Sequence, residues 1–285
     1  MLITDFHLLY KQQGLSEEVI KTFQLIIYSY FKKYGRKFPF RTQISPYNVL
    51  VSELMLQQTQ ASRVSEKFLE FIQYFPDFES LSKAPLDEVL KIWQGLGYNR
   101  RAIALKDIAM KIVEEFDGQL PNSVEILKTF PQIGHNTASS IVAFAFNTPS
   151  FFIETNIRRV YIYYFFPKKN LISDKEIMPV LEESMDNENP RKWYYALMDY
   201  GVMLKKTHPG LNKRSAHYRK QSNFKGSTRE IRGNILKLLL SGKKLTEHEL
   251  SSILNCSPKL MSNIINSLLM EGFIEREGHH LRLKK

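Results

Sequence analysis

The stretch SVEILKTFPQIGHNTASSIVAFAFN, residues 123–147, carries the pattern that decides the fold. Apolar side chains recur at helical spacing on both sides of a tight turn at residues 131–134. The second helix begins after Gly134, so its first backbone N–H groups lack helical partners and suit an anion such as a phosphate. A Pro-x-x-Gly turn between helices is common, and its weight here comes from the residues around it.

A carboxylate closes the apolar run that follows this turn. Glu154 comes twenty residues after Gly134 and is followed by Asn156 and the basic pair Arg158 and Arg159. A lone ionised carboxylate is costly beside apolar surface. We therefore expect Glu154 to have a partner, a shifted pKa or a chemical role.

A second carboxylate and several polar groups precede the turn. SPYNVLVSELMLQQTQASRV, residues 45–64, places Glu53 among apolar neighbours and then presents Gln57 and Gln58, whose amides can hydrogen-bond base edges. WQGLGYNRRA, residues 93–102, puts Tyr98 on a glycine-rich turn, where a flat ring could stack on bases or wedge between them. Each feature taken singly is more often structural than functional.

The composition indicates a soluble globular protein with a polyanionic partner. The chain of 285 residues is 43% hydrophobic and 24% charged, with a net charge of +11. Nucleic acid is the commonest such partner, although a basic surface can also serve a membrane face or solubility alone. The single cysteine, Cys256, excludes a disulfide framework and fits a reducing compartment. No apolar run has the length of a membrane span and the N-terminus has no signal-peptide pattern, so we expect a cytoplasmic, nucleoid-associated protein.

The periodicity predicts an all-α fold up to about residue 204, with no strand before residue 270. The expected helices are listed by residue: 16–35, two within 47–75, short ones near 80 and 85, 99–118, two within 123–147, 154–165, 175–185 and 193–204. Residues 205–226 then carry many basic and no acidic side chains. Residues 227–285 show three helices and a hairpin of two short strands. This order is typical of a winged helix, a module that binds DNA or another protein.

Six segments in order, GRKFPFR, SPYNVLVSELMLQQTQ, APLDEVLKIWQGLGYNRRA, FPQIGHNTA, IETNIRRV and ALMDYG, resemble the helix-hairpin-helix DNA glycosylase superfamily. The resemblance covers roughly residues 20–222, and SELMLQQTQ with WQGLGY is typical of the adenine-specific branch. It implies a two-lobed fold that flips a base from the duplex into a pocket between the lobes. The expected domains are 1–34 with 149–222 as one helical lobe, 35–148 as a six-helix barrel, and 226–285 as the winged-helix-like domain.

The resemblance also implies roles for individual residues. Glu53 takes the place of the general acid that protonates the base. Glu154, with Asn156 beside it, takes the place of the carboxylate that stabilises the cationic sugar. Gln58 and Tyr98 would enter the DNA stack. The full set of expected DNA contacts is Gln57, Gln58, Tyr98, Arg100, Gln132, Gly134, His135, Asn136, Thr137, Arg158, Lys213 and Arg214. The expected partner is double-stranded DNA with a damaged, modified or mismatched base, and the expected state is a monomer.

Two site positions depart from the family pattern. The family has Asp where this chain has Glu154, and a carboxylate displaced by about 1 Å can lower a rate on the order of a hundredfold. Asn136 stands where branches that also cut the strand through a Schiff base carry Lys, and where adenine enzymes carry Tyr or Ser. Without that amine we expect a monofunctional glycosylase.

The cofactor pattern also differs. The family's four iron–sulfur cysteines would fall on Lys205, Asn212, Ser215 and Gln221, so we expect no cluster. The only ion that we expect is a structural alkali cation at the hairpin. Lys213, Arg214, Arg219 and Lys220 are the expected phosphate contacts of this loop. The family's oxidised-guanine-recognition domain is replaced by residues 226–285, and Gln132 stands where the hairpin usually has Gly.

These observations lead to a monofunctional DNA glycosylase that hydrolyses the N-glycosidic bond of a flipped base, adenine by default. A different damaged or modified base is the first alternative. A bifunctional glycosylase and lyase is the second, and a DNA-binding lesion sensor with a degraded catalytic lobe is the third.

Overall fold

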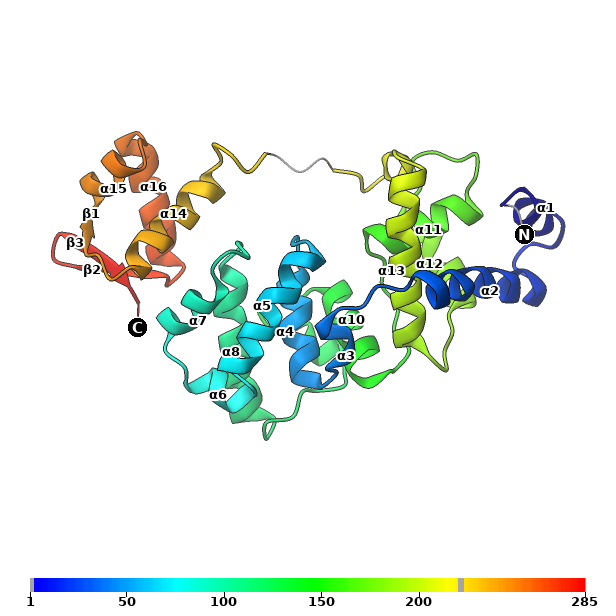
Figure 1. The fold of residues 1–285 in the computed structure, drawn as a ribbon, viewed down its shortest axis with the longest axis horizontal. Helices are drawn as coiled ribbons and strands as arrows, with labels where there is room; N and C mark the ends of the chain where they lie inside the picture. Colours follow the sequence, from blue (N-terminus) through cyan, green and yellow to red (C-terminus); the bar gives the residue numbers. More distant parts are fainter. Residues whose placement is uncertain (1–2, 220–222, 285) are drawn as a thin grey trace. The chain divides into compact units, whose positions relative to one another are not determined.

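The computed structural model describes residues 3–219 and 223–284, and most of them are helical (Figure 1). The helices before the basic loop are α1 (Ile3–Gln13), α2 (Glu17–Tyr34), α3 (Pro39–Thr42), α4 (Pro46–Leu56), α5 (Ala61–Tyr74), α6 (Phe78–Lys83), α7 (Leu86–Trp93), α8 (Arg100–Glu115), α9 (Val124–Leu127), α10 (His135–Phe146), α11 (Thr155–Phe165), α12 (Asp174–Ser184) and α13 (Pro190–Thr207). The 3-10 helix η1 (Leu211–Arg214), α14 (Thr228–Leu240), α15 (Glu247–Ile253) and α16 (Pro258–Met270) follow, with strands β1 (Leu245–Thr246), β2 (Ile274–Glu277) and β3 (His280–Leu283). The predicted helical fold class is confirmed. None of the helices in the described ranges is both long and apolar enough for a membrane span.

The described residues form two compact units. The first comprises residues 3–53, 121–129 and 133–219, and the second comprises residues 54–120, 130–132 and 223–284. Helix α4 runs through the boundary between Glu53 and Leu54. The predicted domain boundaries stay predictions.

The helix ends follow local capping chemistry. The Ser16 hydroxyl accepts a hydrogen bond from the Val19 N–H at 3.3 Å and so caps α2, as its sequence predicts. Asp77 and Ser80 cap α6 reciprocally. After α8 the chain reverses at Gly118, which has a φ of 73° that favours glycine. Helix α1 is not among the predicted helices, because no capping residue in the sequence marks its start.

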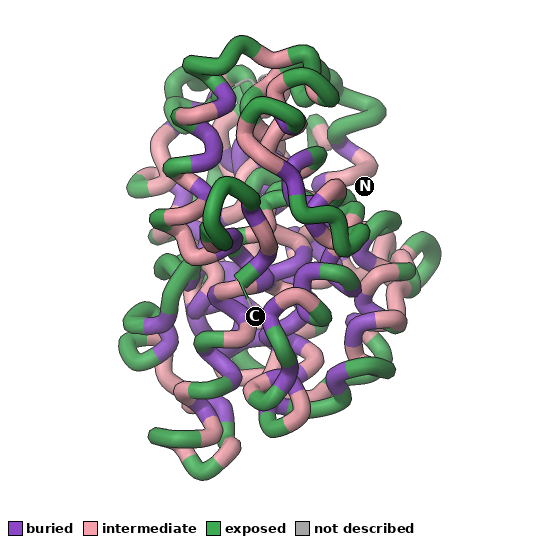
Figure 2. Tube along the Cα trace, turned by 90° about the vertical axis from the view of Figure 1, so that its left-hand side faces the viewer, coloured by how far each residue is buried: buried purple, intermediate pink, exposed green. Residues whose placement is uncertain are grey.

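An aromatic core holds the first unit together. Helix α11 packs along α13, and α2 packs on α13. Phe23, Tyr161 and Trp193 come from these three helices and meet edge to face, with ring centroids 5.6 Å apart in both contacts of Phe23. Figure 2 shows buried segments alternating with exposed ones along the chain. Helix α5, for example, buries one face with Val64, Phe68 and Phe71, whereas α10 is buried all round from Ala138 to Phe144.

The second unit contains helices α5 to α8 and the C-terminal elements. Trp93 at the end of α7 packs edge to face on Phe71 of α5 at 5.9 Å, and both side chains are buried. The C-terminal elements run α14, β1, α15, α16, β2, β3, and the antiparallel sheet has the order β1–β3–β2. The expectation of no strand before residue 270 is wrong, because β1 pairs with β3. Two residues are too short to show an alternating pattern, and β1 exists through that pairing.

The basic loop after α13 is attached by main-chain hydrogen bonds to the segment between α11 and α12. The Ile172 N–H donates to the Arg214 carbonyl and the Ala216 N–H donates to the Ile172 carbonyl, both at 2.9 Å. The Arg214 guanidinium donates to the carbonyls of Lys169 and Phe166. Arg214 therefore stabilises the loop, and a phosphate would have to compete with these carbonyls. The predicted phosphate contact at Lys220 and the expected cluster position at Gln221 lie outside the described residues.

Candidate active site

Glu53 lies on the last turns of α4 and is half-buried. Its Oε2 accepts a hydrogen bond from the Ser140 hydroxyl of α10 at 2.5 Å. Within residues 3–219 and 223–284 no group donates to Oε1, and Oε1 is absent from the fully buried unpaired oxygens of that part of the chain. One carboxyl oxygen is therefore anchored, and the other is open to solvent or to a ligand.

The surroundings of Glu53 favour its protonated form. Burial raises the pKa of Glu53 to about 7, although the Ser140 hydrogen bond lowers it. The charge of Glu154 raises the pKa further, and the Arg41 guanidinium lowers it. A carboxyl with a pKa near neutrality can act as a general acid at physiological pH.

Glu154 caps the N-terminus of α11. Its Oε1 accepts hydrogen bonds from the backbone N–H groups of Asn156 at 2.8 Å and Ile157 at 3.1 Å. Oε2 accepts from the Asn156 side-chain amide at 3.3 Å. Burial raises the pKa of Glu154, while these three donors and Arg158 lower it. Asp, Asn, Ser or Thr usually occupies the N-cap position. The partners expected for this carboxylate are the N–H donors of Asn156 and Ile157, so Glu154 has a structural role as the cap of α11.

Asn156 is fixed from the opposite side by α13. Arg159, which is buried, donates to the Asn156 side-chain oxygen at 2.8 Å and to the Gly201 carbonyl at 2.6 Å. A Cβ on Gly201 would lie 2.3 Å from the Asn156 carbonyl oxygen and 2.7 Å from its carbonyl carbon. The glycine of ALMDYG therefore permits the close approach of α13 to the first turn of α11.

Gly201→Ala should displace that first turn and destabilise the protein. The added methyl group meets backbone atoms that cannot rotate away, and overpacking of this kind costs about 1–3 kcal/mol. Gly233→Ala in α14 is the matched control, because a Cβ there meets nothing within 4 Å and alanine is the better helix former. Thermal unfolding should show a lower Tm for Gly201→Ala and an unchanged or higher Tm for Gly233→Ala. An unchanged Tm for Gly201→Ala would contradict the close approach.

Arg36 and Arg41 surround the buried Asp199 in the same unit. Asp199 is 2% exposed and accepts from the Arg36 side chain at 2.7 Å and from the Arg41 side chain at 3.0 Å. The Arg41 guanidinium also lies 4.4 Å from the centre of the Tyr195 ring. Burial, and then the charge of Glu53, raise the pKa of Tyr195 to about 12. Tyr195 is therefore neutral, and Asp199 holds the positive charge of Arg41 in place near Glu53.

The turn before α10 leaves the start of that helix exposed. Gly134 is the N-cap residue, and His135 and Asn136 in the first turn are exposed. The His135 ring shares a hydrogen bond with the Phe151 carbonyl at 3.1 Å, and the Asn136 amide donates to the Ile153 carbonyl at 2.9 Å. These bonds tie the start of α10 to the segment that leads into Glu154. The predicted phosphate site thus has exposed N–H donors, and its role stays a prediction.

Three of the predicted DNA contacts in the second unit have left-handed backbone conformations. The φ angles are 55° at Gln58, 47° at Tyr98 and 60° at Gln132. This region is unfavourable for residues with a side chain and costs on the order of 1–3 kcal/mol each, and such strain clusters at ligand-binding sites. Gln132 stands where the resemblance implies glycine, and its φ of 60° is a conformation that glycine adopts easily.

Arg101, which is not among the predicted site residues, holds two of these loops together. Its guanidinium is 2% exposed and donates to the carbonyls of Leu54, Met55 and Gln57, each at 2.7 Å. It also donates to the Gly97 carbonyl at 2.8 Å and bonds the Tyr98 carbonyl at 3.3 Å. Burial lowers the pKa of Arg101 to about 10. The only signal in the sequence was a second arginine after the glycine-rich turn.

Several of the other candidate DNA contacts already have partners within their own unit. In the second unit, the Tyr98 hydroxyl accepts from Arg229 at 2.6 Å and Arg100 pairs with Glu271 at 2.6 Å. In the first unit, Arg158 donates both N–H groups to Asp174, at 2.6 and 2.8 Å. Lys213 and Arg219 are exposed, and Gln57 donates to the Gln132 carbonyl at 3.0 Å. DNA would have to replace several of these contacts.

The residues at the expected cluster positions do not fit an iron–sulfur cluster. Lys205, Asn212 and Ser215 supply no thiolate, and the single cysteine of the chain, Cys256, follows α15 in the second unit. The Ser215 hydroxyl accepts from the His217 N–H at 3.0 Å instead. Across the described ranges, no three His, Cys, Asp or Glu side chains gather where they could hold a metal ion. The expected alkali cation stays a prediction.

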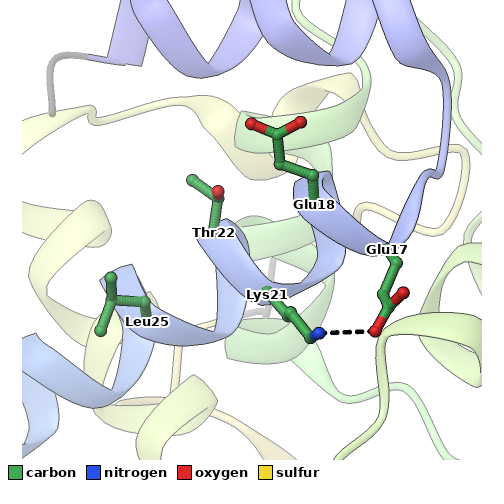
Figure 3. A pocket seen from close by; sticks show the side chains of 5 residues that line it. All are labelled: Glu17, Glu18, Lys21, Thr22 and Leu25. Atoms are coloured by element: carbon green, nitrogen blue, oxygen red, sulfur yellow. Dashed lines mark ion pairs between the residues drawn. The ribbon is translucent and has the colours of Figure 1, made fainter.

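A shallow depression of about 360 Å³ lies on α2, lined by Glu17, Glu18, Lys21, Thr22 and Leu25 (Figure 3). Lys21 and Glu17 form an ion pair at 2.5 Å between exposed side chains on the same face of α2 (Figure 3). Exposed ion pairs of this kind contribute little to stability. None of the five lining residues belongs to the acidic site, by which we mean Glu53 and Glu154.

Residues 51–186 match the family described as "HhH-GPD superfamily base excision DNA repair protein". An adenine DNA glycosylase of Buchnera aphidicola subsp. Baizongia pistaciae is 35% identical over 184 residues, which are 64% of this chain and 52% of the relative. An adenine DNA glycosylase of Mycolicibacterium smegmatis is 28% identical over 87% of this chain and 91% of its own length. The chain thus spans about half the length of the Buchnera relative.

The fold agrees with these matches. The solved structure of a thermostable thymine-DNA glycosylase superimposes with a TM-score of 0.59 at 24% identity, covering 68% of this chain and 94% of that one. The matched residues 51–186 include Glu53, the turn before α10 and Glu154, the elements that build the acidic site. Residues 51–186 of this chain, which include both carboxylates, are therefore similar to the HhH-GPD superfamily of base excision DNA repair proteins.

Proposed function

We propose that the chain is a DNA glycosylase in which Glu53 is the general acid and Glu154 the stabilising carboxylate. The observation that carries the proposal is the anchored Glu53 carboxyl, whose pKa of about 7 leaves a proton available near neutral pH. Glu154 supplies the second carboxylate of the same unit and is held by N–H donors. Two carboxyl groups in different environments are what cleavage of a glycosidic bond requires.

The proposed reaction proceeds in two stages. Glu53 transfers its proton to a nitrogen of the flipped base, and the bond between the sugar and the base breaks with its electron pair leaving on the base. The charge of Glu154 stabilises the cation-like sugar. A water oxygen then bonds to the sugar carbon, and the proton of that water returns to Glu53. The products are a free base and an abasic site.

Adenine is the first candidate for the base, because both similar relatives are named adenine DNA glycosylases. Asn136 has no amine, so a Schiff base is not expected at that position. The expected partner is double-stranded DNA, which the net charge of +11 favours.

The test is release of a base from a panel of duplexes that carry adenine, modified adenine, uracil, thymine or modified cytosine opposite each base. Wild type, Glu53→Gln and Glu154→Asp are compared, since Asp is a preferred capping residue and should preserve the cap of α11. Adenine release by the wild type supports the proposal, and no release from any duplex contradicts it. Trapping of a covalent adduct by borohydride would contradict the monofunctional assignment.

A DNA-binding lesion sensor is the second candidate. The observation that favours it is the use of both Glu154 oxygens in capping contacts. In that case the chain would bind duplexes that contain a lesion and release no base from them. The same panel, read by binding and by base release, separates the two functions.

If Arg100 contacts phosphate, Glu271→Gln should tighten DNA binding. Glu271 pairs with Arg100 and with Arg232, each at 2.6 Å, and the Arg100 hydrogen bond, the largest cause, helps lower the pKa of Glu271 to about 2. Loss of that charge frees cations for the phosphates, so the Kd at low salt should fall several-fold and the salt dependence should steepen by about one counterion.

Glu79→Gln is the matched control for this measurement. It breaks the exposed pair with Lys83, which is not an expected DNA contact. Fluorescence anisotropy at several salt concentrations gives both slopes. If Glu271→Gln and the wild type bound DNA with equal Kd values, Arg100 would not be a phosphate contact.

A further inference from the structure

Ser140 is a buried polar residue in contact with Glu53 that the proposed reaction has not used. It lies on α10 with 3% of its surface exposed, between Ser139 and Ile141, which are buried as well. Its oxygen lies 2.5 Å from Glu53 Oε2 and 3.0 Å from the Thr137 carbonyl oxygen. A serine hydroxyl has one proton, so it can donate to only one of these two oxygens at a time.

The two donor directions have different consequences for Glu53. When Ser140 donates to the Thr137 carbonyl, the Glu53 proton can reside on Oε2 and be donated to Ser140. When Ser140 donates to Glu53 Oε2, that oxygen is occupied as an acceptor, and the carboxyl proton resides on Oε1. Oε1 is the oxygen that is open to solvent or a ligand. Only this second arrangement presents an acidic proton to a substrate.

We propose that Ser140 is a positioning residue for the acid: its hydroxyl occupies Oε2 of Glu53 and thereby directs the transferable proton to Oε1. The proposal rests on the proposed function of Glu53 and adds to it the group that orients the carboxyl. The other charged or titratable groups that face Glu53 are Glu154, Arg41 and Tyr195. None of them is changed by a substitution at Ser140, so the effect of the hydroxyl can be isolated.

Ser140→Ala removes the hydroxyl, and Ser139→Ala is the matched control. Ser139 is the adjacent residue on α10 and is 1% exposed, and its hydroxyl has no hydrogen-bond partner within the described ranges. Ser140→Thr retains a hydroxyl and tests rescue. The Ser140 hydrogen bond lowers the pKa of Glu53. Its removal should therefore raise the Glu53 pKa by about 1 unit, and loss of orientation should slow single-turnover base release about tenfold.

The pKa is measured by ¹³C NMR titration of protein labelled at the glutamate carboxyl carbons, with the Glu53 signal assigned by its absence in Glu53→Gln. The proposal predicts a raised Glu53 pKa in Ser140→Ala, wild-type behaviour in Ser139→Ala, and recovery in Ser140→Thr. An unchanged Glu53 pKa in Ser140→Ala, or the same change in Ser139→Ala, would overturn it. The titration needs no turnover, so absence of base release by the wild type would refute the proposed function and leave the Ser140 result independent.

Discussion

Glu53→Gln is expected to abolish most base release while making the protein more stable at alkaline pH. The amide has no acidic proton, and loss of a general acid lowers a rate by about 10²–10⁴. Burial raises the pKa of Glu53 from its ordinary 4.5 to about 7, so the folded state binds this proton more tightly than the unfolded state. The stability that this proton supplies is present below about pH 4.5 and is lost as the pH rises through about 7.

The stability difference between the variant and the wild type therefore depends on pH. At pH values above about 7 the wild type contains a half-buried charge that the variant lacks, and the shift corresponds to at most about 3 kcal/mol in the free energy of unfolding. Near pH 4.5 the difference should vanish. Urea denaturation at both pH values measures it, with base release assayed on the same preparations. If Glu53→Gln and the wild type were equally stable at both pH values, the raised pKa of Glu53 would be contradicted. Full base release by Glu53→Gln would show that Glu53 is not the acid.

Arg101→Lys should cause the largest loss of stability of the charge-conserving substitutions considered. The buried guanidinium reaches carbonyls of the α4 C-terminus and of the Tyr98 loop together, and the three donors of an ammonium group cannot reproduce this planar set. Each buried carbonyl left without a donor costs about 1–3 kcal/mol, so we expect a loss of about 3 kcal/mol or more. DNA binding should weaken as well, since the loops of Gln58 and Tyr98 lose their common anchor.

Arg100→Lys is the control for Arg101→Lys. Arg100 is adjacent on α8, and its side chain is 60% exposed and forms one ion pair. Its substitution should change the free energy of unfolding by less than about 0.5 kcal/mol. Similar losses for the two variants would show that the buried carbonyls do not depend on Arg101.

Most of the fold could be predicted because its elements depend on local chemistry. Ser16, Gly118 and the turn at residues 131–134 mark helix ends that the structure confirms. Strand β1 could not be predicted, since two residues form a strand only through pairing with β3. The domain boundaries depend on packing between distant segments, which periodicity does not report.

The candidate site was predicted only in part, for a similar reason. Glu53 and Glu154 could be identified from motifs, and the structure places both in one unit where the charge of Glu154 affects the pKa of Glu53. Ser140, Gly201 and Arg101 were not predicted, because each acts through a tertiary contact with a residue at least 42 positions away. Serine, glycine and arginine are too common on helices for their positions to signal such contacts.

The most direct test of the central claim is the pH dependence of single-turnover base release from about pH 5 to about pH 9, on the duplex that the wild type cleaves best. If Glu53 is the acid, the rate should be constant below its pKa of about 7 and fall about tenfold for each further pH unit. A rate that stays constant through pH 7, or one that Glu53→Gln retains in full, would contradict the account.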